Sequence, residues 1–270
     1  MKGLALLSLE GKRALVTGAG TGLGQSISRA FAEAGAEVVI VGRRREPLEE
    51  TAVAVNAAGG TSQVLVADVT KEEDIERLHS EAGQIDILVN NAGIAPDEAW
   101  QTVPLDSWRA VLDVNLLAPF RLCQVFAPPM MERGWGRIIN IASVYGSIAG
   151  KPHLYPDSWD PSSYFASKHG VHGITRYLSV RLAPRGVCIN SLSPGGVATT
   201  DHRAKNRAGR TEAELAAEEL RTDRFLHDEI PMLRIGGDDD YTGPAVFLAS
   251  PGAKYITGQN VIVDGGWSVW

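Results

Sequence analysis

The chain has 270 residues, of which 44% are hydrophobic and 21% are charged, and its net charge is -6 at neutral pH. This length allows one large α/β domain, and no Pro/Gly/Ser-rich or charge-run segment divides it, so we expect a single domain over residues 1–270. The mild acidity and the absence of a basic stripe argue against a nucleic acid partner.

The N-terminal segment and the two cysteines favour a reducing, cytoplasmic environment. The apolar run before Glu10 is too short for a membrane span or a signal peptide. Cys123 and Cys188 are far apart in the sequence and offer no metal-ligand spacing. We therefore expect no membrane partner and no metal site.

Short β-branched segments alternate with longer helical patterns along the chain. The predicted strands are 12–17, 37–42, 62–67, 85–90, 137–142, 187–193 and 260–263. The predicted helices are 22–34, 46–58, 71–82, 105–133, 163–183 and 240–249, the fourth interrupted at Pro119, Pro128 and Pro129. Several strands are continuously apolar, as parallel strands covered on both faces must be. The alternation predicts an α/β fold: a doubly wound (Rossmann) parallel sheet of about seven strands, with helices on both faces.

A glycine-rich turn joins the first predicted strand to the first predicted helix. Its pattern is Gly18-x-x-x-Gly22-x-Gly24, which departs from the strict G-x-G-x-x-G fingerprint because Leu23 and Gln25 occupy positions that the fingerprint gives to glycine. The turn still offers a tight bend, a close backbone approach and a helix N-terminus to a pyrophosphate. A flexible turn without a ligand is the alternative.

Tyr164 and Lys168 are four residues apart, so on a helix the phenol and the ammonium project from the same face. Ionising a free tyrosine at pH 7 costs about 4 kcal/mol, because its pKa is about 10. A neighbouring ammonium favours the phenolate and makes Tyr164 a candidate acid and base at an alcohol or carbonyl oxygen. Taken alone, the pair also fits a surface tyrosine that lies over a lysine stem.

Further motifs occur together with this pair in a fixed order. They are Thr17-Gly18-x-x-x-Gly22-x-Gly24, Asp68, Asn90-Asn91-Ala92-Gly93, Asn115, Ser143, Tyr164-x-x-x-Lys168 and Pro194-Gly195-x-x-x-Thr199. In these motifs the chain resembles the classical short-chain dehydrogenases/reductases, and the resemblance runs from Leu9 to Trp267. It implies a catalytic tetrad of Asn115, Ser143, Tyr164 and Lys168.

The resemblance gives each member of this tetrad a role. Tyr164 would be the acid and base, and Ser143 would hydrogen-bond the substrate oxygen. Lys168 would lower the tyrosine pKa and hold the nicotinamide ribose hydroxyls. Asn115 would kink its helix and anchor a water that passes protons to Lys168. The hydride chemistry would belong to a nicotinamide cofactor.

The same resemblance implies a row of cofactor contacts. Asp68 would meet the adenine, Asn91 and Gly93 would support the central sheet and line the adenine ribose, and Thr199 would hold the carboxamide. The full set of expected contacts is Gly18, Thr21, Gly22, Leu23, Gly24, Arg43, Arg44, Asp68, Val69, Asn91, Ala92, Gly93, Tyr164, Lys168, Pro194, Gly195, Val197 and Thr199.

The residues after the second predicted strand favour NADP over NAD. NAD-specific members of the family usually carry an acid there, whereas this chain has Gly42-Arg43-Arg44-Arg45 with no carboxylate before Glu46. An arginine at this place can fork onto a 2′-phosphate and stack on the adenine. The alternative is a solvated arginine loop in an NAD enzyme, and Thr21 lacks the basic residue that one NADP-using subgroup has at its position.

Two segments are expected to border a small-molecule substrate. Ser143 and Tyr164 are 164 − 143 = 21 positions apart, more than in most family members, so an extra segment at about 146–162 would enter the pocket. A lid is expected at about 200–231, with a cationic start that could bind a carboxylate, sulfonate or phosphate and an acidic helix from residue 212. Ordinary surface loops are the alternative. The expected substrate contacts are Ser143, His153, Trp159 and Arg203.

The ends of the chain are most similar to the bacterial sugar and sugar-acid dehydrogenases of the family, of the gluconate and deoxy-keto-gluconate type. The similarity lies in Ser8-Leu-Glu-Gly-Lys12 and in Asp264-Gly-Gly-Trp267. It implies NAD(P)-dependent interconversion of a secondary alcohol and a carbonyl on a sugar, sugar acid or polyol. It also implies the family's usual homotetramer.

Three other functions are weighed against this one. Reduction of a 3-oxoacyl group or a small ketone is the alternative within the same chemistry. A nucleotide-sensing regulator is less favoured, because it would need the glycine turn but no acid/base tetrad. An epimerase or dehydratase like the extended relatives would need a larger C-terminal domain.

Overall fold

The computed structural model describes residues 2–96, 99–149, 161–197 and 211–269. Its centre is a seven-stranded parallel sheet in the order β3-β2-β1-β4-β5-β6-β7. The strands are β1 (Arg13–Thr17), β2 (Glu37–Gly42), β3 (Thr61–Val66), β4 (Ile87–Asn90), β5 (Gly136–Ile141), β6 (Val187–Pro194) and β7 (Asn260–Val263). The strand order reverses between β1 and β4, which is where an open sheet forms a crevice at the carboxyl ends.

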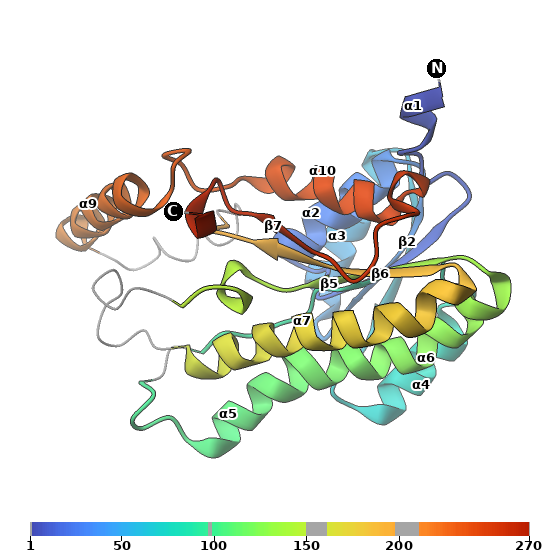
Figure 1. Cartoon of the computed structure of the whole chain (residues 1–270), viewed down its shortest axis with the longest axis horizontal. Coiled ribbons are helices and arrows are strands. Elements are labelled where there is room, and N and C mark those ends of the chain that lie inside the picture. Colours follow the sequence, from blue (N-terminus) through green and yellow to red (C-terminus); the bar gives the residue numbers. More distant parts are fainter. Residues whose placement is uncertain (1, 97–98, 150–160, 198–210, 270) are drawn as a thin grey trace.

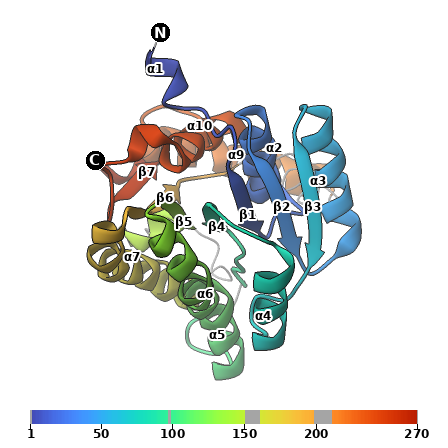
Figure 2. The same cartoon turned by 90° about the vertical axis from the view of Figure 1, so that its right-hand side faces the viewer.

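Helices cover both faces of this sheet (Figures 1 and 2). One face carries α2 (Gly22–Glu33), α3 (Arg45–Ala57) and α10 (Asp238–Ala249). The other carries α4 (Glu72–Glu81), α5 (Leu105–Leu112), α6 (Ala118–Arg133) and α7 (Ser162–Leu182). Helix α9 (Glu212–Glu229) and the short α1 (Lys2–Ala5) lie outside these layers. The doubly wound, single-domain fold is therefore as predicted.

Alternate side chains of one strand enter different cores, which explains the continuously apolar strands. Ala14 and Val16 of β1 pack with Phe31 of α2 in the first core. Leu15, between them, packs with Leu78 of α4 and Leu122 of α6 in the second. Because both faces of a strand are buried, no polar alternation is left in its sequence.

The predicted helix 105–133 is divided near the first of its three prolines, Pro119, but not at the other two. A π-helical turn, η1 (Asp113–Leu117), separates α5 from α6, while Pro128 and Pro129 lie inside α6. Pro119 has no amide hydrogen, so the carbonyl of Asn115 lacks its α-helical donor four residues on. The expectation of breaks at Pro128 and Pro129 was therefore wrong, and the irregularity is centred on Asn115.

By length and composition alone, the helical stretch Leu105–Arg133 is long and apolar enough to cross a membrane. Its apolar side chains are those of a core helix, since Leu122, Phe126 and Met130 are almost fully buried in the second core.

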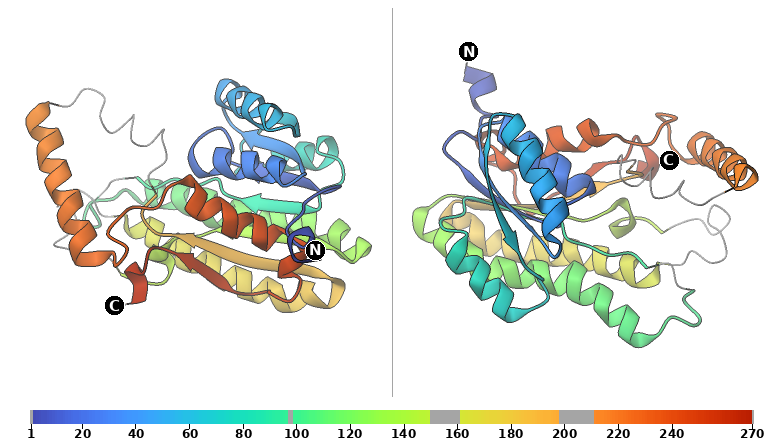
Figure 3. Two further views of the ribbon diagram at one scale, coloured as in Figure 1. Left: turned by 90° about the horizontal axis from the view of Figure 1, so that it is seen from above. Right: turned by 180° about the vertical axis from the view of Figure 1, so that it is seen from behind.

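Two segments at opposite ends of the molecule complete the fold. Helix α9 lies at one end, beside the C-terminal segment, and α1 lies at the other (Figures 1 and 3). The start of α9 agrees with the acidic helix expected from residue 212, although the helix continues to Glu229. The remaining helical turns are η2 (Val144–Gly146), η4 (Ala183–Arg185), η5 (Pro251–Ala253) and η6 (Trp267–Val269).

Candidate active site

A cleft of about 470 Å³ opens at the carboxyl ends of the strands next to β1. Its lining contains ten of the expected cofactor contacts: Gly18, Thr21, Leu23, Arg43, Arg44, Asp68, Val69, Asn91, Ala92 and Gly93. It also contains residues that the sequence reasoning missed: Gly20, Gly42, Pro47, Leu48, Ala67, Ile94 and Val114. Gly42 and Ala67 lie at the ends of β2 and β3, directly before predicted contacts, so strand-end position could have indicated them. Val114 lies in a helical turn beside the predicted Asn115, and Leu48 carries no such signal.

The glycine turn has no room for side chains. A Cβ on Gly18 would lie 2.8 Å from the Cα of Ala92, and Gly18 has a φ of 63° that disfavours other residues. A Cβ on Gly24 would lie 2.4 Å from the carbonyl oxygen of Gly18. Thr21 is the N-cap of α2 and its side chain makes no capping hydrogen bond. The first amides of α2 are therefore open to an anion at the cleft.

Asn91 ties the turn after β4 to the turn after β1. Its Nδ2 donates to the carbonyl oxygens of Thr17 at 2.9 Å and Gly18 at 3.1 Å. The hydroxyl of Thr17 in return accepts from the amides of Asn91 and Ala92. These bonds fix the two walls of the cleft against each other.

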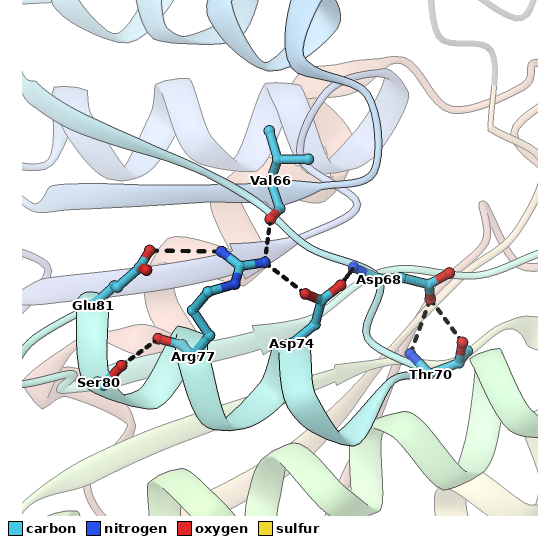
Figure 4. Close-up of polar contacts among 7 residues, drawn as sticks. All are labelled: Val66, Asp68, Thr70, Asp74, Arg77, Ser80 and Glu81. Carbon is cyan, nitrogen blue, oxygen red and sulfur yellow. Dashed lines mark hydrogen bonds and ion pairs between the residues drawn. The ribbon is translucent and has the colours of Figure 1, made fainter.

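A polar network holds the turn after β3, where Asp68 lines the cleft (Figure 4). The Asp68 carboxylate accepts from both the amide and the hydroxyl of Thr70. The Asp68 amide donates to Asp74 at 2.7 Å, and Arg77 pairs with Asp74 and donates to the carbonyl of Val66. This bonding lowers the pKa of Asp74, chiefly through the Asp68 amide and then through Arg77. Asp68 is thus held in place by its own neighbours.

Arg43 and Arg44 line the opposite side of the cleft, after β2. Among the described residues, no carboxylate lies within ion-pair distance of either guanidinium, whereas the neighbouring Arg45 pairs with Glu49 at 3.5 Å. Two unpaired cations in a ligand-sized cleft are available to an anionic group.

Ser143, Tyr164 and Lys168 come together near the carboxyl end of β5. Ser143 hydrogen-bonds Tyr164, and the ammonium of Lys168 lies 5.3 Å from the centroid of the tyrosine ring. Lys168 is buried, donates to the carbonyl oxygen of Ile141 at 2.7 Å, and its pKa is lowered to about 8 by burial. The lysine therefore exchanges its proton near neutral pH.

The pKa of Tyr164 departs from the direction that the resemblance implied. Burial raises it above the ordinary value of a tyrosine, and the hydrogen bond from Ser143 lowers it only in part. The phenolate loses hydration on burial, which outweighs the bond from Ser143, and the lowering that we expected from Lys168 does not contribute to the shift.

Asn115 supports this group from the π-helical turn. Its side chain bonds both the amide and the carbonyl of Ile94, each at 2.9 Å, and donates to Ser167 at 3.1 Å. A Cβ on Gly93 would lie 3.3 Å from the Asn115 side-chain oxygen and 3.7 Å from the Lys168 nitrogen. The lysine therefore lies directly behind a residue that lines the cleft.

Several expected contacts lie elsewhere. Pro194 ends β6, the amide of Gly195 donates to Val263, and Val197 pairs with Gly236, so these residues do not line the cleft. Gly22 and Gly24 form the first turn of α2 behind it. His153, Trp159, Thr199 and Arg203 lie outside the described residues.

Known proteins place this arrangement in a family. Residues 18–268 match a family model described as enoyl-(acyl carrier protein) reductase. The chain is 39% identical over 266 residues to a galactitol 2-dehydrogenase (L-tagatose-forming) of Cereibacter sphaeroides, covering 97% of each protein. The chain belongs to the short-chain dehydrogenase/reductase family.

Other members of the short-chain dehydrogenase/reductase family are also similar along their whole length. A 3-oxoacyl-[acyl-carrier-protein] reductase of Vibrio cholerae is 35% identical over 264 residues, covering 96% of this chain and 98% of that protein. The solved structure of a gluconate 5-dehydrogenase from Burkholderia cenocepacia, in complex with NADP and tartrate, aligns with a TM-score of 0.84 at 33% identity and 99% coverage of both chains. The chain is therefore an NAD(P)-dependent oxidoreductase that interconverts an alcohol and a carbonyl.

Proposed function

We propose that this enzyme uses NADP and acts on a sugar, sugar acid or polyol, with Tyr164 as its acid and base. The observation that carries the proposal is the group of Ser143, half-buried Tyr164 and buried Lys168, whose ammonium lies behind Gly93 of the cleft. The same cleft contains Arg43 and Arg44, and no carboxylate of the described residues pairs with either. The first feature supplies the proton chemistry, and the second supplies a partner for a phosphate.

The cleft fits a dinucleotide phosphate in shape and charge. The missing Cβ atoms of Gly18 and Gly24 let the turns after β1 and β4 pack closely together, which leaves the N-terminus of α2 open to a pyrophosphate. Asp68 and Val69 would contact the adenine, and Arg43 and Arg44 would bind the 2′-phosphate. When bound, the cofactor supplies or accepts the hydride.

The residues of the tetrad would handle the proton and the substrate oxygen. In reduction, the Tyr164 hydroxyl gives its proton to the carbonyl oxygen while Ser143 hydrogen-bonds the same oxygen; in oxidation, the phenolate takes the alcohol proton. Lys168, with a pKa of about 8, would hold the nicotinamide ribose hydroxyls and exchange a proton with Tyr164 through them and a bound water. Asn115 keeps the π-helical turn and the Ile94 loop in place around the lysine.

If Arg43 and Arg44 bind the 2′-phosphate, removing either should weaken the binding of NADPH but not of NADH. In Arg43→Ala and Arg44→Ala variants we expect the Kd for NADPH to rise about tenfold or more, because a hydrogen bond to a charged group contributes about 1.5 to 3 kcal/mol and about 1.4 kcal/mol is tenfold. The Kd for NADH should stay unchanged. Side-by-side fluorescence titrations measure both. Arg45→Ala is the matched control, since Arg45 pairs with Glu49 and does not line the cleft. Equal losses for both cofactors would refute the phosphate contact.

The substrate class rests on the relatives that act on galactitol and gluconate. Reduction of a 3-oxoacyl group is the second candidate, favoured by the Vibrio cholerae relative. Assays with NADP and a panel of polyols and aldonates, beside NADPH and a 3-oxoacyl thioester, decide between them. Faster turnover of the thioester than of any polyol or aldonate would overturn the proposed substrate class.

We also propose that the enzyme is a cytoplasmic homotetramer, by inference from its family. Exposed apolar side chains on the helical face support an interface there: Leu105 of α5, and Tyr177 and Val180 of α7, are each more than half exposed. Light scattering should give about four times the 28.9 kDa chain mass. A monomer mass would contradict the proposed assembly.

A further inference from the structure

Four aromatic side chains form a continuous row beside Ser143 and Tyr164. Phe165 of α7 stacks on Tyr145 of η2 with ring centroids 4.5 Å apart. Tyr145 meets Trp267 of η6 edge to face at 5.3 Å, and Trp267 meets Phe225 of α9 in the same way at 5.0 Å. This aromatic row joins four elements that are far apart in the sequence, at the end of the molecule where α9 and the C-terminal segment lie together (Figures 1 and 3).

Trp267, at the centre of the aromatic row, is rigidly held. Its side chain is only 6% exposed and packs with Val144 and Ile230. The Asp264 carboxylate accepts from the amides of Gly266 and Ser268 on either side, at 2.9 and 2.7 Å. The indole is therefore a fixed support between α9 and the turn after β5.

That turn also carries Ser143. The hydroxyl oxygen of Ser143 accepts from the amide of Tyr145 at 3.2 Å, and its carbonyl accepts from the amide of Gly146 at 2.9 Å. The residue whose amide bonds the Ser143 hydroxyl is thus the residue whose ring packs between Phe165 and Trp267, so a displacement of its backbone would move that hydroxyl. A shift of a fraction of an ångström at such a hydroxyl is enough to reduce catalysis.

We propose that Trp267 is a positioning residue, which orients the Ser143 hydroxyl through Tyr145 and makes that orientation depend on the contact between Phe225 of α9 and the indole. The inference rests on the proposed roles of Ser143 and Tyr164. By this inference, the C-terminal turn and α9 influence catalysis through the orientation of Ser143, in addition to any contact that they make with the substrate.

The hydrogen bond between Ser143 and Tyr164 links the position of Ser143 to the pKa of Tyr164, which can be read from the pH profile of the enzyme. A purely structural effect of Trp267 would leave that pKa unchanged. Losing this bond raises the pKa of Tyr164, since the bond lowers it in the intact protein. Among the described residues, the charged group facing the phenol is Lys168 of the same helix. The Lys168 ammonium is held by the carbonyl oxygen of Ile141 in β5, outside the aromatic row. We therefore expect a shift of the pH profile to report on Ser143.

The test compares Phe225→Ala with Phe247→Ala, a partly exposed phenylalanine of α10 outside the aromatic row. For Phe225→Ala we expect kcat to fall about tenfold and the Kd for NADPH to stay unchanged. The rising, acid-side limb of the kcat/KM profile for alcohol oxidation, where Tyr164 loses its proton, should move to higher pH. Phe247→Ala should behave as wild type. An unmoved pH profile, or a rise in KM with kcat unchanged, would overturn the inference.

A second pair of variants guards against simple misfolding. Trp267→Phe keeps a ring between Tyr145 and Phe225, so it should retain most of the kcat and the wild-type pH profile, whereas Trp267→Ala should reproduce the Phe225→Ala shift. If Trp267→Ala does not fold, Phe225→Ala and Trp267→Phe still decide. Retained turnover in a Tyr164→Phe variant would refute the proposed function itself. If Tyr164→Phe loses turnover but the pH profiles of Phe225→Ala and Trp267→Ala do not move, only the role of Trp267 is refuted.

Discussion

Replacing Tyr164 with Phe should lower kcat by roughly 10²- to 10⁴-fold, the usual contribution of a positioned acid or base, while leaving the Kd for NADPH within about twofold, an effect of less than 0.5 kcal/mol. The substitution removes the hydroxyl that faces Ser143 and keeps the ring that packs over Lys168. Tyr164 is half-buried, and a phenylalanine in its place offers no group that can give or take a proton. Steady-state turnover and a fluorescence titration of the same preparation measure the two quantities.

Tyr177→Phe is the matched control for this experiment. Tyr177 lies on the same helix, is 55% exposed and stacks with Arg181 at 3.6 Å. Loss of its hydroxyl should change neither turnover nor cofactor binding. Retained turnover in Tyr164→Phe would remove the tyrosine from the reaction, whereas equal losses in both variants would point to damage of α7 and not to acid/base chemistry.

Replacing Gly24 with Ala should abolish tight binding of both NADPH and NADH. The new methyl group would lie 2.4 Å from the carbonyl oxygen of Gly18 and 2.5 Å from Nδ2 of Asn91. Both partners belong to the bonds that join the turns after β1 and β4, so the backbone there has to move. We expect a loss of stability of about 1 to 3 kcal/mol, as for other overpacked sites. Thermal unfolding and cofactor titration check the two effects.

Gly173 offers the control for a glycine-to-alanine change in a helix. It lies within α7, and a Cβ at this position would meet no atom within 4 Å. Gly173→Ala should keep cofactor binding and gain about 0.5 to 1 kcal/mol from the better helix former. Wild-type cofactor affinity in Gly24→Ala would show that the turn tolerates a side chain and is not the pyrophosphate site.

The strand predictions succeeded because strands that are buried on both faces consist of continuous apolar residues, which can be recognised in the sequence. All seven predicted strands are present and differ from the observed ones by at most two residues at an end. The helix after residue 105 was harder, because proline disfavours helices on average yet Pro128 and Pro129 are accommodated inside α6. Pro119 is a local signal for the irregularity at Asn115, whereas the bonds of the Asn115 side chain to Ile94, 21 residues away, depend on the tertiary fold.

The sequence by itself determined the class of the fold, the glycine turn and the spacing of Tyr164 and Lys168, because each depends on residues that are close together in the chain. The tertiary structure determined which residues line the cleft and that burial raises the pKa of Tyr164. It separated Arg45, which pairs with Glu49, from Arg43 and Arg44, which pair with no carboxylate in the part of the chain that the structure describes. It also brought Phe225 and Trp267 to the turn of Ser143. These features depend on solvent exclusion and on contacts between distant segments, neither of which is encoded in any single stretch of the chain.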